Sequence, residues 1–172
     1  MPRVTAASPD HGRDAMPLSE LLSADRIALL VEPVDRQRVL DAAARLLADA
    51  SPVSTAAIAE CLRQRERLGS TAIGHGVAIP HGRSNAFEQA RAAFLRLREP
   101  VDFDAGDGQP VDLVFAMTIP EHFTQQHLQL LSELAERFAD PAFRADLRAA
   151  PDAATLRHVL LAALPAPAAA TR

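Results

Sequence analysis

After Asp35, apolar residues recur every three or four positions, which is the spacing of one face of a helix. The Asp35 carboxylate can accept hydrogen bonds from the free backbone N–H groups at a helix start. The apolar positions that follow it are Val39, Leu40, Ala43, Leu46 and Leu47. This pattern predicts a helix after Asp35 that buries a single face.

Two later stretches have the same period. Ser54 can cap a helix that stops at Gly69, and its apolar positions are Ile58, Cys61, Leu62 and Leu68. Thr124 can cap a further helix, whose apolar positions are Leu128, Leu131, Ala135 and Phe138. Asp140–Pro141 ends that helix, and two more helical segments are predicted over residues 141–149 and 152–163.

Short apolar runs between the helices are typical of β-strands. They are residues 27–31, 71–73, 77–79, 91–97 and 111–119. The first run is ended by Pro33, and the last lies between Pro110 and Pro120. Residues 101–110 are rich in Asp and Gly, which predicts a loop or hairpin there.

These helices and strands intermix along a chain of 172 residues, a length that fits one domain. We therefore predict a single domain of the α/β (α+β) class, with a mixed sheet of about five strands sandwiched by helices. The domain is expected over residues 17–163. Polar and proline-containing ends predict a flexible N-terminal arm over residues 1–16 and a flexible tail over residues 164–172.

Composition and charge narrow the classes of function. Hydrophobic residues make up 48% of the chain and charged residues 23%, which excludes global disorder. No apolar run approaches the ~18 residues that cross a bilayer, so no membrane insertion is expected. The net charge of −4 and the absence of Trp and Tyr argue against a nucleic-acid partner. The single cysteine, Cys61, excludes an intramolecular disulfide, and with no secretory signal at the start it predicts a reducing, cytoplasmic location.

His81 is the first candidate for chemistry. It follows a proline, which fixes the local backbone, and it precedes Gly82, which would leave one side of the ring open. A neutral imidazole, with an ordinary pKa of ~6.5, is a good nucleophile toward phosphorus. From its position alone, a histidine that merely packs at a turn is the simpler interpretation.

His127 is the second candidate. If Thr124 is the N-cap, His127 is the third residue of its helix. The helix dipole there opposes protonation of the ring, and free N–H groups in the same turn favour a nearby anion. A neutral ring can also donate its one N–H to a phosphoryl oxygen. The alternative is a ring that only flanks the apolar face of the helix.

Arg65 lies on the apolar stripe of the predicted 54–68 helix, where a charge is costly unless it is paired. It either reaches solvent along its aliphatic stem or meets an anion. The neighbouring Glu66 could orient a histidine N–H or simply face water. Both residues therefore enter the candidate site as supporting groups.

No other motif supports a cofactor or a metal. His75 with His81, and His122 with His127, lack the spacing of a helical zinc pair. The chain has no lysine and thus no phosphate-binding G-x-x-x-x-G-K-[ST] loop, and it has no G-x-S-x-G nucleophile elbow. We therefore expect neither a bound cofactor nor a metal.

The segment from Glu66 to Gly82 reads ERLGSTAIGHGVAIPHG. An acidic residue, a Leu-Gly-Ser-Thr turn and an apolar-Ala-apolar-Pro-His-Gly run resemble the signature of the IIA domains (EIIA) of the bacterial phosphoenolpyruvate-dependent phosphotransferase system (PTS), mannitol/fructose type. The similarity continues through PVDF (100–103), QPVDLVFA (109–116) and TQQHLQLL (124–131), and it covers about residues 18–163. The opening LSELL and the Gly-Ser-Thr turn look most like the nitrogen-regulatory branch, EIIA-Ntr.

The resemblance implies a role for each matching residue. His81 matches the histidine that accepts the phosphoryl group from an HPr-type phosphocarrier, called NPr in the nitrogen branch. His127 matches the second active-site histidine, which contacts that group, and Arg65 and Glu66 match the Arg-Glu pair before the turn. The resemblance also implies a sheet with helices on both faces, and a phosphocarrier rather than an enzyme that turns over small molecules.

Two functions follow from the family, and a third stays open. The nitrogen-regulatory branch implies a protein that signals its phosphorylation state to protein targets, for example potassium transport systems or sensor kinases. The alternative is a sugar-specific IIA component that passes phosphate to a fructose/mannitol-type IIB domain. A binding module that keeps the fold without carrying phosphate would not need both His81 and His127, which disfavours it.

Overall fold

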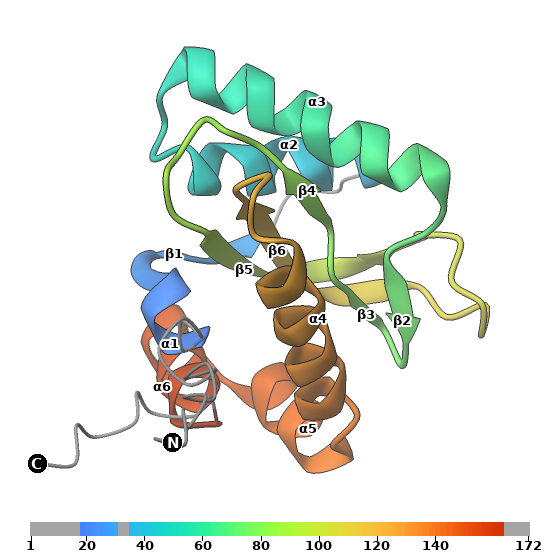
Figure 1. Ribbon diagram of the computed structural model, residues 1–172. Helices are drawn as coiled ribbons and strands as arrows, with labels where there is room; N and C mark the ends of the chain where they lie inside the picture. Colours follow the sequence, from blue (N-terminus) through green and yellow to red (C-terminus); the bar gives the residue numbers. More distant parts are fainter. Residues whose placement is uncertain (1–17, 31–34, 164–172) are drawn as a thin grey trace, which may run out of the picture.

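The computed structural model describes residues 18–30 and 35–163. The predicted arm (1–16), the predicted tail (164–172) and the positions Val31 and Pro33 lie outside the described residues. In chain order the elements are α1 (Leu18–Leu21), β1 (Leu22–Leu30), α2 (Arg36–Leu47), α3 (Pro52–Leu68), β2 (Ala72–Gly74), β3 (Val77–Ala78), β4 (His81–Arg83), β5 (Arg91–Val101), β6 (Val111–Ile119), α4 (Thr124–Phe138), α5 (Pro141–Ala149) and α6 (Ala153–Ala163) (Figure 1).

Within residues 18–30 and 35–163 the six strands form one mixed sheet in a single α/β domain, which confirms the predicted class. The strand order is β1-β5-β6-β3-β2, and β4 also pairs with β6. β5 and β6 are antiparallel, while β1 runs parallel to β5, and β3 and β4 run parallel to β6. The strand that the sequence does not predict is β4, which carries His81.

β3 and β4 form one interrupted course along β6. Val77 faces Leu113 and His81 faces Met117, so the register is the same on both sides of the break. The break falls at Pro80, which has no N–H to donate. Its carbonyl oxygen still accepts the Met117 N–H at 2.9 Å, so the course continues without a shift.

Because side chains alternate across a strand, this course sends successive residues to opposite faces of the sheet. Val77 and Ile79 belong to the apolar cluster on the α4 side, whereas Ala78 belongs to the cluster on the α3 side. The same alternation directs His81 toward α4 and Gly82 toward α3. The unbroken register therefore decides which helix each site residue meets.

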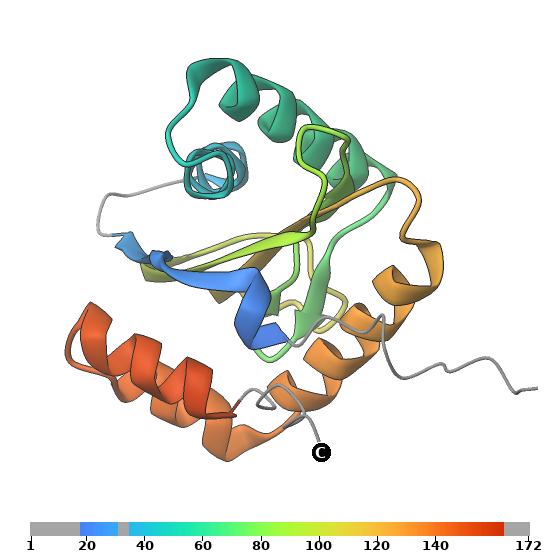
Figure 2. The ribbon, with the colours of Figure 1, turned by 60° about the vertical axis from the view of Figure 1, so that its left-hand side comes forward.

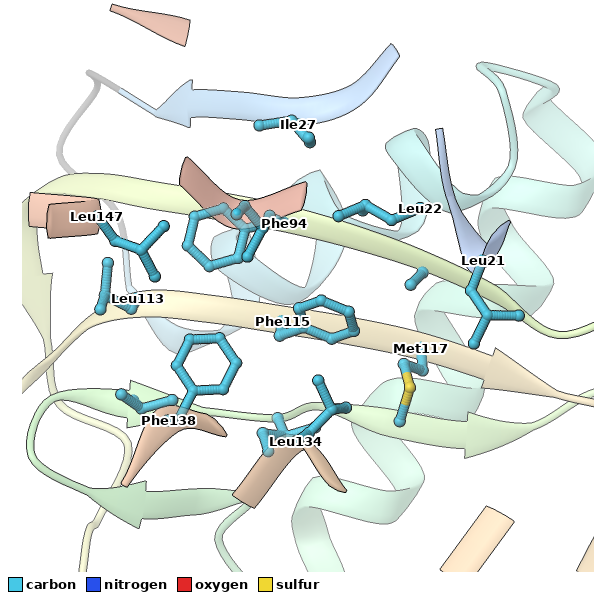
Figure 3. Packing of buried hydrophobic residues seen from close by; sticks show 14 of the residues in the cluster. Leu21, Leu22, Ile27, Phe94, Leu113, Phe115, Met117, Leu134, Phe138 and Leu147 are labelled. Carbon is cyan, nitrogen blue, oxygen red and sulfur yellow. The ribbon is translucent and has the colours of Figure 1, made fainter. Parts of the chain in front are cut away.

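Helices cover both faces of the sheet: α2 and α3 one face, and α4, α5 and α6 the other (Figures 1 and 2). Aromatic rings fill the α4 side, where Phe94 of β5 stacks on Phe138 of α4 with 6.4 Å between centroids (Figure 3). Phe115 of β6 meets Phe138 edge-on at 6.1 Å. Both apolar faces of the sheet are thus buried, and α4 is packed firmly at its C-terminal half.

The helices begin where the predicted N-cap residues place them in only some cases. Asp35 caps α2 as predicted, since its side chain accepts the Arg38 N–H at 2.9 Å. The prediction that Ser54 caps the next helix is wrong: α3 begins at Pro52, with Ser51 at the N-cap position. Proline suits the first helical position because its φ is already helical and its missing N–H costs nothing there.

The start of α4 also differs from the prediction. Phe123 occupies the N-cap position without a side-chain cap, and Thr124 is the first helical residue rather than the cap. His127 is therefore the fourth residue of the helix, not the third. The buried face consists of His127, Leu130, Leu134 and Phe138, so the predicted stripe through Leu128 is wrong, and Leu128 is 65% exposed.

Among the described residues, no helix is both long and apolar enough to cross a membrane.

Candidate functional site

His81 opens β4 and is held by its own backbone. Its Nδ1 atom lies 2.7 Å from the carbonyl oxygen of Ile79. A carbonyl oxygen can only accept, so Nδ1 carries the proton. In the neutral ring this leaves the lone pair on Nε2, on the side away from the strand. The half-buried His81 ring is therefore fixed in the tautomer that makes Nε2 a nucleophile.

His127 approaches from α4 and lies against His81. The two ring centroids are 5.2 Å apart, and the ring planes meet at 77°. His127 is buried, and within the described part of the chain neither of its ring nitrogens has a hydrogen-bond partner. A buried polar group without a partner is costly and typically marks a functional position. The His127 ring thus carries buried hydrogen-bonding atoms, next to His81, whose capacity is unused among the described residues.

Burial and nearby charge keep both rings neutral. Burial lowers the pKa of His81 below 6.5, and the Arg65 cation acts in the same direction, against the opposing effects of the Ile79 carbonyl and the Glu66 carboxylate. Burial likewise lowers the pKa of His127 to about 4, with further contributions from His81, Arg83 and Arg65. At neutral pH the site therefore offers one nucleophilic nitrogen and one uncharged N–H donor.

Arg65 lies near both histidines, as its effect on their pKa values shows. Its Nη1 donates to the carbonyl oxygen of Gly69 at 2.9 Å, at the C-terminal end of α3. The side chain is half-buried and holds the end of its own helix. Of the two outcomes predicted for Arg65, the structure shows neither in full: the guanidinium bonds to the end of α3 and its charge lowers the pKa of both rings.

Glu66 is buried and does neither of the things predicted for it. Its carboxylate accepts the backbone N–H of Thr71 at 3.2 Å and the Thr71 hydroxyl at 2.6 Å. Arg36 Nη1 lies 3.9 Å from the same carboxylate. Ser70, beside Thr71, donates its hydroxyl to the Phe103 carbonyl oxygen. Glu66 therefore fixes the turn that leads into the site strand, and in the part of the chain that the structure describes its carboxylate bonds to Thr71 and not to a histidine.

Gly82 does not leave the histidine open, contrary to the prediction. It is buried on the α3 side of the sheet, where an added Cβ would overlap the Sγ atom of Cys61 and lie 3.3 Å from the Cys61 carbonyl oxygen. The Cys61 thiol donates to the carbonyl oxygen of Arg83 at 3.0 Å. Glycine at this position is needed because α3 passes directly against the strand.

Arg83 is marked by no motif in the sequence, yet its charge acts on the site. It is two residues after His81 on β4, so strand alternation places both side chains on the same side of the sheet. Its cation contributes to the low pKa of His127. The one signal that could have identified it is this period of two, which becomes readable only once β4 is known to be a strand.

The arrangement favours an anion bonded to Nε2 of His81. Two guanidinium groups, Arg65 and Arg83, lie near the rings, and His127 can donate a hydrogen bond. Cations and preformed donors stabilise the oxygens of a transferring phosphoryl group. No group of three or more His, Cys, Asp or Glu residues able to hold a metal ion occurs within residues 18–30 and 35–163. The groups present therefore suit phosphoryl transfer to a histidine.

A comparison with known protein families identifies the family of this chain. The family model described as "Phosphoenolpyruvate-dependent sugar phosphotransferase system, EIIA 2" matches residues 20–163. The chain belongs to this PTS EIIA type-2 family. This EIIA protein is thus a member of a phosphocarrier family, and the expected resemblance is confirmed.

Relatives place this EIIA protein near the nitrogen-regulatory branch. The nitrogen regulatory protein of Pseudomonas aeruginosa is 41% identical over 145 residues, which are 84% of this chain and 94% of that protein. The crystal structure of nitrogen regulatory protein IIA-Ntr from Neisseria meningitidis aligns with a TM-score of 0.75 and 44% identity, over 83% of this chain and 97% of that chain. This EIIA protein is therefore a homologue of IIA-Ntr.

The mannitol branch shares the fold. The crystal structure of IIA mannitol from Escherichia coli aligns with a TM-score of 0.65 and 19% identity, over 80% of this chain and 97% of that chain. At this identity the match concerns the fold alone. The mixed sheet with helices on both faces is thus common to the two branches.

Proposed function

We propose that this protein is a cytoplasmic regulatory phosphocarrier of the nitrogen-related phosphotransferase system, which accepts a phosphoryl group on Nε2 of His81 from an HPr-like (NPr-type) carrier. The observation that carries the proposal is the 2.7 Å contact between Nδ1 of His81 and the Ile79 carbonyl oxygen. It leaves Nε2 unprotonated in a neutral ring, which is the form that attacks phosphorus.

The transfer balances without an added acid or base. Nε2 of His81 attacks the phosphorus of the donor's phosphohistidine, and the N–P bond to the donor breaks as the new N–P bond forms. A donor ring that is protonated on its other nitrogen leaves as a neutral imidazole. The positive charge thereby moves to the His81 ring, where Nδ1–H faces the Ile79 carbonyl oxygen. A charge-assisted hydrogen bond stabilises this product.

The surrounding groups act on the phosphoryl oxygens. During the transfer the group is loosely bonded to both nitrogens and its charge lies on three oxygens. His127 would donate its free N–H to one oxygen, and Arg65 would lie near enough to offset the charge. Glu66 supports the site indirectly, since it holds Thr71 in the turn before β3.

Phosphorylation would change the charge of the surface around His81 by nearly two units. A protein that binds this surface in one state would therefore leave it in the other. Potassium transport systems or sensor kinases are the kind of target that the nitrogen branch suggests. The second candidate function is transfer onward to a fructose/mannitol-type IIB domain, which is supported by the 30% identity, over 86% of this chain, to the fructose-specific EIIA component of Haloferax volcanii.

The proposal is tested by intact mass after incubation with phosphoenolpyruvate, enzyme I and the HPr-like carrier of the nitrogen branch. The expected result is an acid-labile gain of one phosphoryl group that is absent in His81→Ala. His127→Ala is expected to be phosphorylated more slowly. His75→Ala is the matched control, because His75 is exposed at the β2–β3 turn, and it should behave like the unchanged protein.

Full phosphorylation of His81→Ala would contradict the assignment of the nucleophile. Efficient transfer from the phosphorylated protein to a sugar-type IIB domain would favour the sugar-specific function over regulation. If neither the nitrogen-branch nor the sugar-branch carrier phosphorylates the protein, it is a binding module that does not carry phosphate.

A further inference from the structure

Asn85 and Glu121 continue the pairing of β4 with β6 after the backbone ladder ends. Arg83 faces Ile119 in the register, and the last backbone bond runs from Ser84 N–H to the Ile119 carbonyl oxygen at 2.9 Å. One step further, Nδ2 of Asn85 donates to Oε2 of Glu121 at 3.0 Å. The Glu121 N–H donates to Oδ1 of Asn85 at 3.3 Å. The Asn85 amide thus both gives and accepts a hydrogen bond, and we call this pair the Asn85–Glu121 clamp.

The clamp joins the two segments that carry the histidines. Asn85 follows β4, which presents His81, and Glu121 lies in the connection between β6 and α4, which presents His127. Within that connection the Phe123 N–H donates to the Pro120 carbonyl oxygen at 3.0 Å. His127 N–H in turn donates to the Phe123 carbonyl oxygen at 3.1 Å. A short chain of hydrogen bonds and covalent links therefore leads from the clamp to the second ring.

The strand side of the clamp is already fixed. β4 is paired with β6, and on its other face the Cys61 thiol donates to the Arg83 carbonyl oxygen. Gly82 lies directly against α3. His81 therefore cannot shift easily, and any change in the spacing of the two histidines has to come from α4.

The N-terminal end of α4 is the less constrained side. Its N-cap residue, Phe123, makes no side-chain cap, and the ring nitrogens of His127 have no partner in the part of the chain that the structure describes. The buried apolar residues of α4 itself are Leu130, Leu134 and Phe138, all beyond its first turn, while Phe123 before the helix is only partly buried against the same core. The clamp is thus a side-chain hydrogen-bonded tie between the end of β4 and the segment that leads into the first turn of α4.

We propose that Asn85 and Glu121 are positioning residues, which set the separation of His81 and His127 and keep the His127 ring out of water. Neither residue needs to touch the phosphoryl group. The consequence for phosphoryl transfer rests on the proposed function, whereas the consequence for the His127 environment does not.

The test compares variants that carry the same charge at the clamp. Asn85→Ala removes both hydrogen bonds and keeps the Glu121 carboxylate. The double variant Asn85→Asp/Glu121→Gln reverses the pair: the glutamine amide can donate to the new carboxylate, which can still accept the N–H of residue 121. Gln129→Ala is the matched control, because it breaks a surface amide–carboxylate bond to Glu133 on α4 that has no tie to β4.

The first measurement is an NMR titration of the His127 ring in the unphosphorylated protein. Burial is the main reason that the pKa of His127 lies near 4, so a loosened first turn should raise this pKa toward 6.5 in Asn85→Ala. The double variant and Gln129→Ala should titrate like the unchanged protein. An unchanged pKa in Asn85→Ala, or an equal rise in the double variant, would overturn the proposal. This result does not depend on whether the protein is ever phosphorylated.

The second measurement is the rate of phosphorylation against carrier concentration. Asn85→Ala should lower the maximal rate by about 3- to 10-fold, since small displacements of reacting groups are costly, and should leave the half-saturating carrier concentration unchanged. The double variant should recover the rate. A raised half-saturating concentration with an unchanged maximal rate would instead make Asn85 a docking contact and contradict a positioning role. Both clamp residues are exposed, so Asn85→Ala is expected to fold.

Discussion

The edge of one histidine ring meets the face of the other: the centroids of His81 and His127 lie 5.2 Å apart, with their planes at 77°. The two rings are held in different ways. Nδ1–H of His81 donates a hydrogen bond to the Ile79 carbonyl oxygen, whereas neither ring nitrogen of His127 has a hydrogen-bond partner among the described residues. One ring is thus fixed in its tautomer, and the other has two buried nitrogens whose hydrogen-bonding capacity is unused among the described residues.

Arg65→Gln is expected to raise the pKa of both His81 and His127. The Arg65 cation disfavours a second positive charge nearby and so contributes to the lowered pKa of each ring. NMR titration of the two rings in the unphosphorylated protein measures this directly. Arg67→Gln is the control on the same helix, since Arg67 is exposed and lies 3.6 Å from Glu60. Equal titration curves in Arg65→Gln and the unchanged protein would place Arg65 outside the site.

His127 should make the protein less stable in mild acid. Its pKa is about 4 in the folded state and 6.5 ordinarily, so below pH 6.5 the unfolded chain binds the proton more readily. Stability is therefore complete above pH 6.5 and falls as the pH drops toward 4, with a loss of about 2 kcal/mol from this residue by pH 5. Chemical denaturation at pH 8 and pH 5 measures the loss.

The His127→Gln variant should lose about 2 kcal/mol less stability than the unchanged protein between pH 8 and pH 5. His158→Gln is the control, because His158 is exposed on α6, and it should retain the full pH dependence. A pH dependence in His127→Gln as steep as in the unchanged protein would show that the His127 ring is well solvated.

Gly82→Ala should destabilise the fold by about 1–3 kcal/mol, because the new methyl group would overlap the Cys61 thiol. Removing the thiol should recover part of the loss, so Cys61→Ala/Gly82→Ala should be more stable than Gly82→Ala alone. Recovery stays partial because the Cys61 carbonyl oxygen would still be 3.3 Å from the new Cβ. Thermal or urea unfolding measures all three, and simple additivity of the two single changes would contradict a direct contact.

Glu66 and Thr71 should be strongly coupled. Thr71→Val removes a buried hydroxyl that donates to the Glu66 carboxylate at 2.6 Å, and a cost of roughly 1.5–3 kcal/mol is expected for a hydrogen bond to a charged group. A double-mutant cycle with Glu66→Gln should give a non-zero coupling free energy in urea unfolding. Thr124→Val, at an exposed position without a cap bond, should cost far less.

The sequence predicts most of the helices and strands because they are set by strong apolar periodicity and by Pro or Gly residues at their ends. The strand at Val111–Ile119, the cap at Asp35 and the end of a helix at Gly69 all follow such local signals. The wrong caps at Ser54 and Thr124 have a common reason: either residue type caps a helix only when the chain turns there, and the turn lies at Ser51, before Pro52, in one case and at Phe123 in the other.

The site is less predictable because it depends on register. His81 and His127 stand out by their neighbours in sequence, but the Asn85–Glu121 clamp joins residues that are 36 positions apart and is set by the pairing of β4 with β6. The predicted apolar stripe of α4 is wrong for a related reason. His127 lies on the buried face of the helix, at a position where the apolar pattern predicts a residue such as leucine.

The register that β3 and β4 share along β6 limits how many residues can lie between them. Side chains of a strand alternate between the two faces of the sheet. Inserting or deleting one residue between Ala78 and His81 would therefore move each following side chain to the opposite face. The histidine would then point at α3, where there is room only for a glycine, and the glycine would point at His127. The number of residues between Val77 and His81 is therefore fixed by the sheet register, whereas the side chains between them can vary.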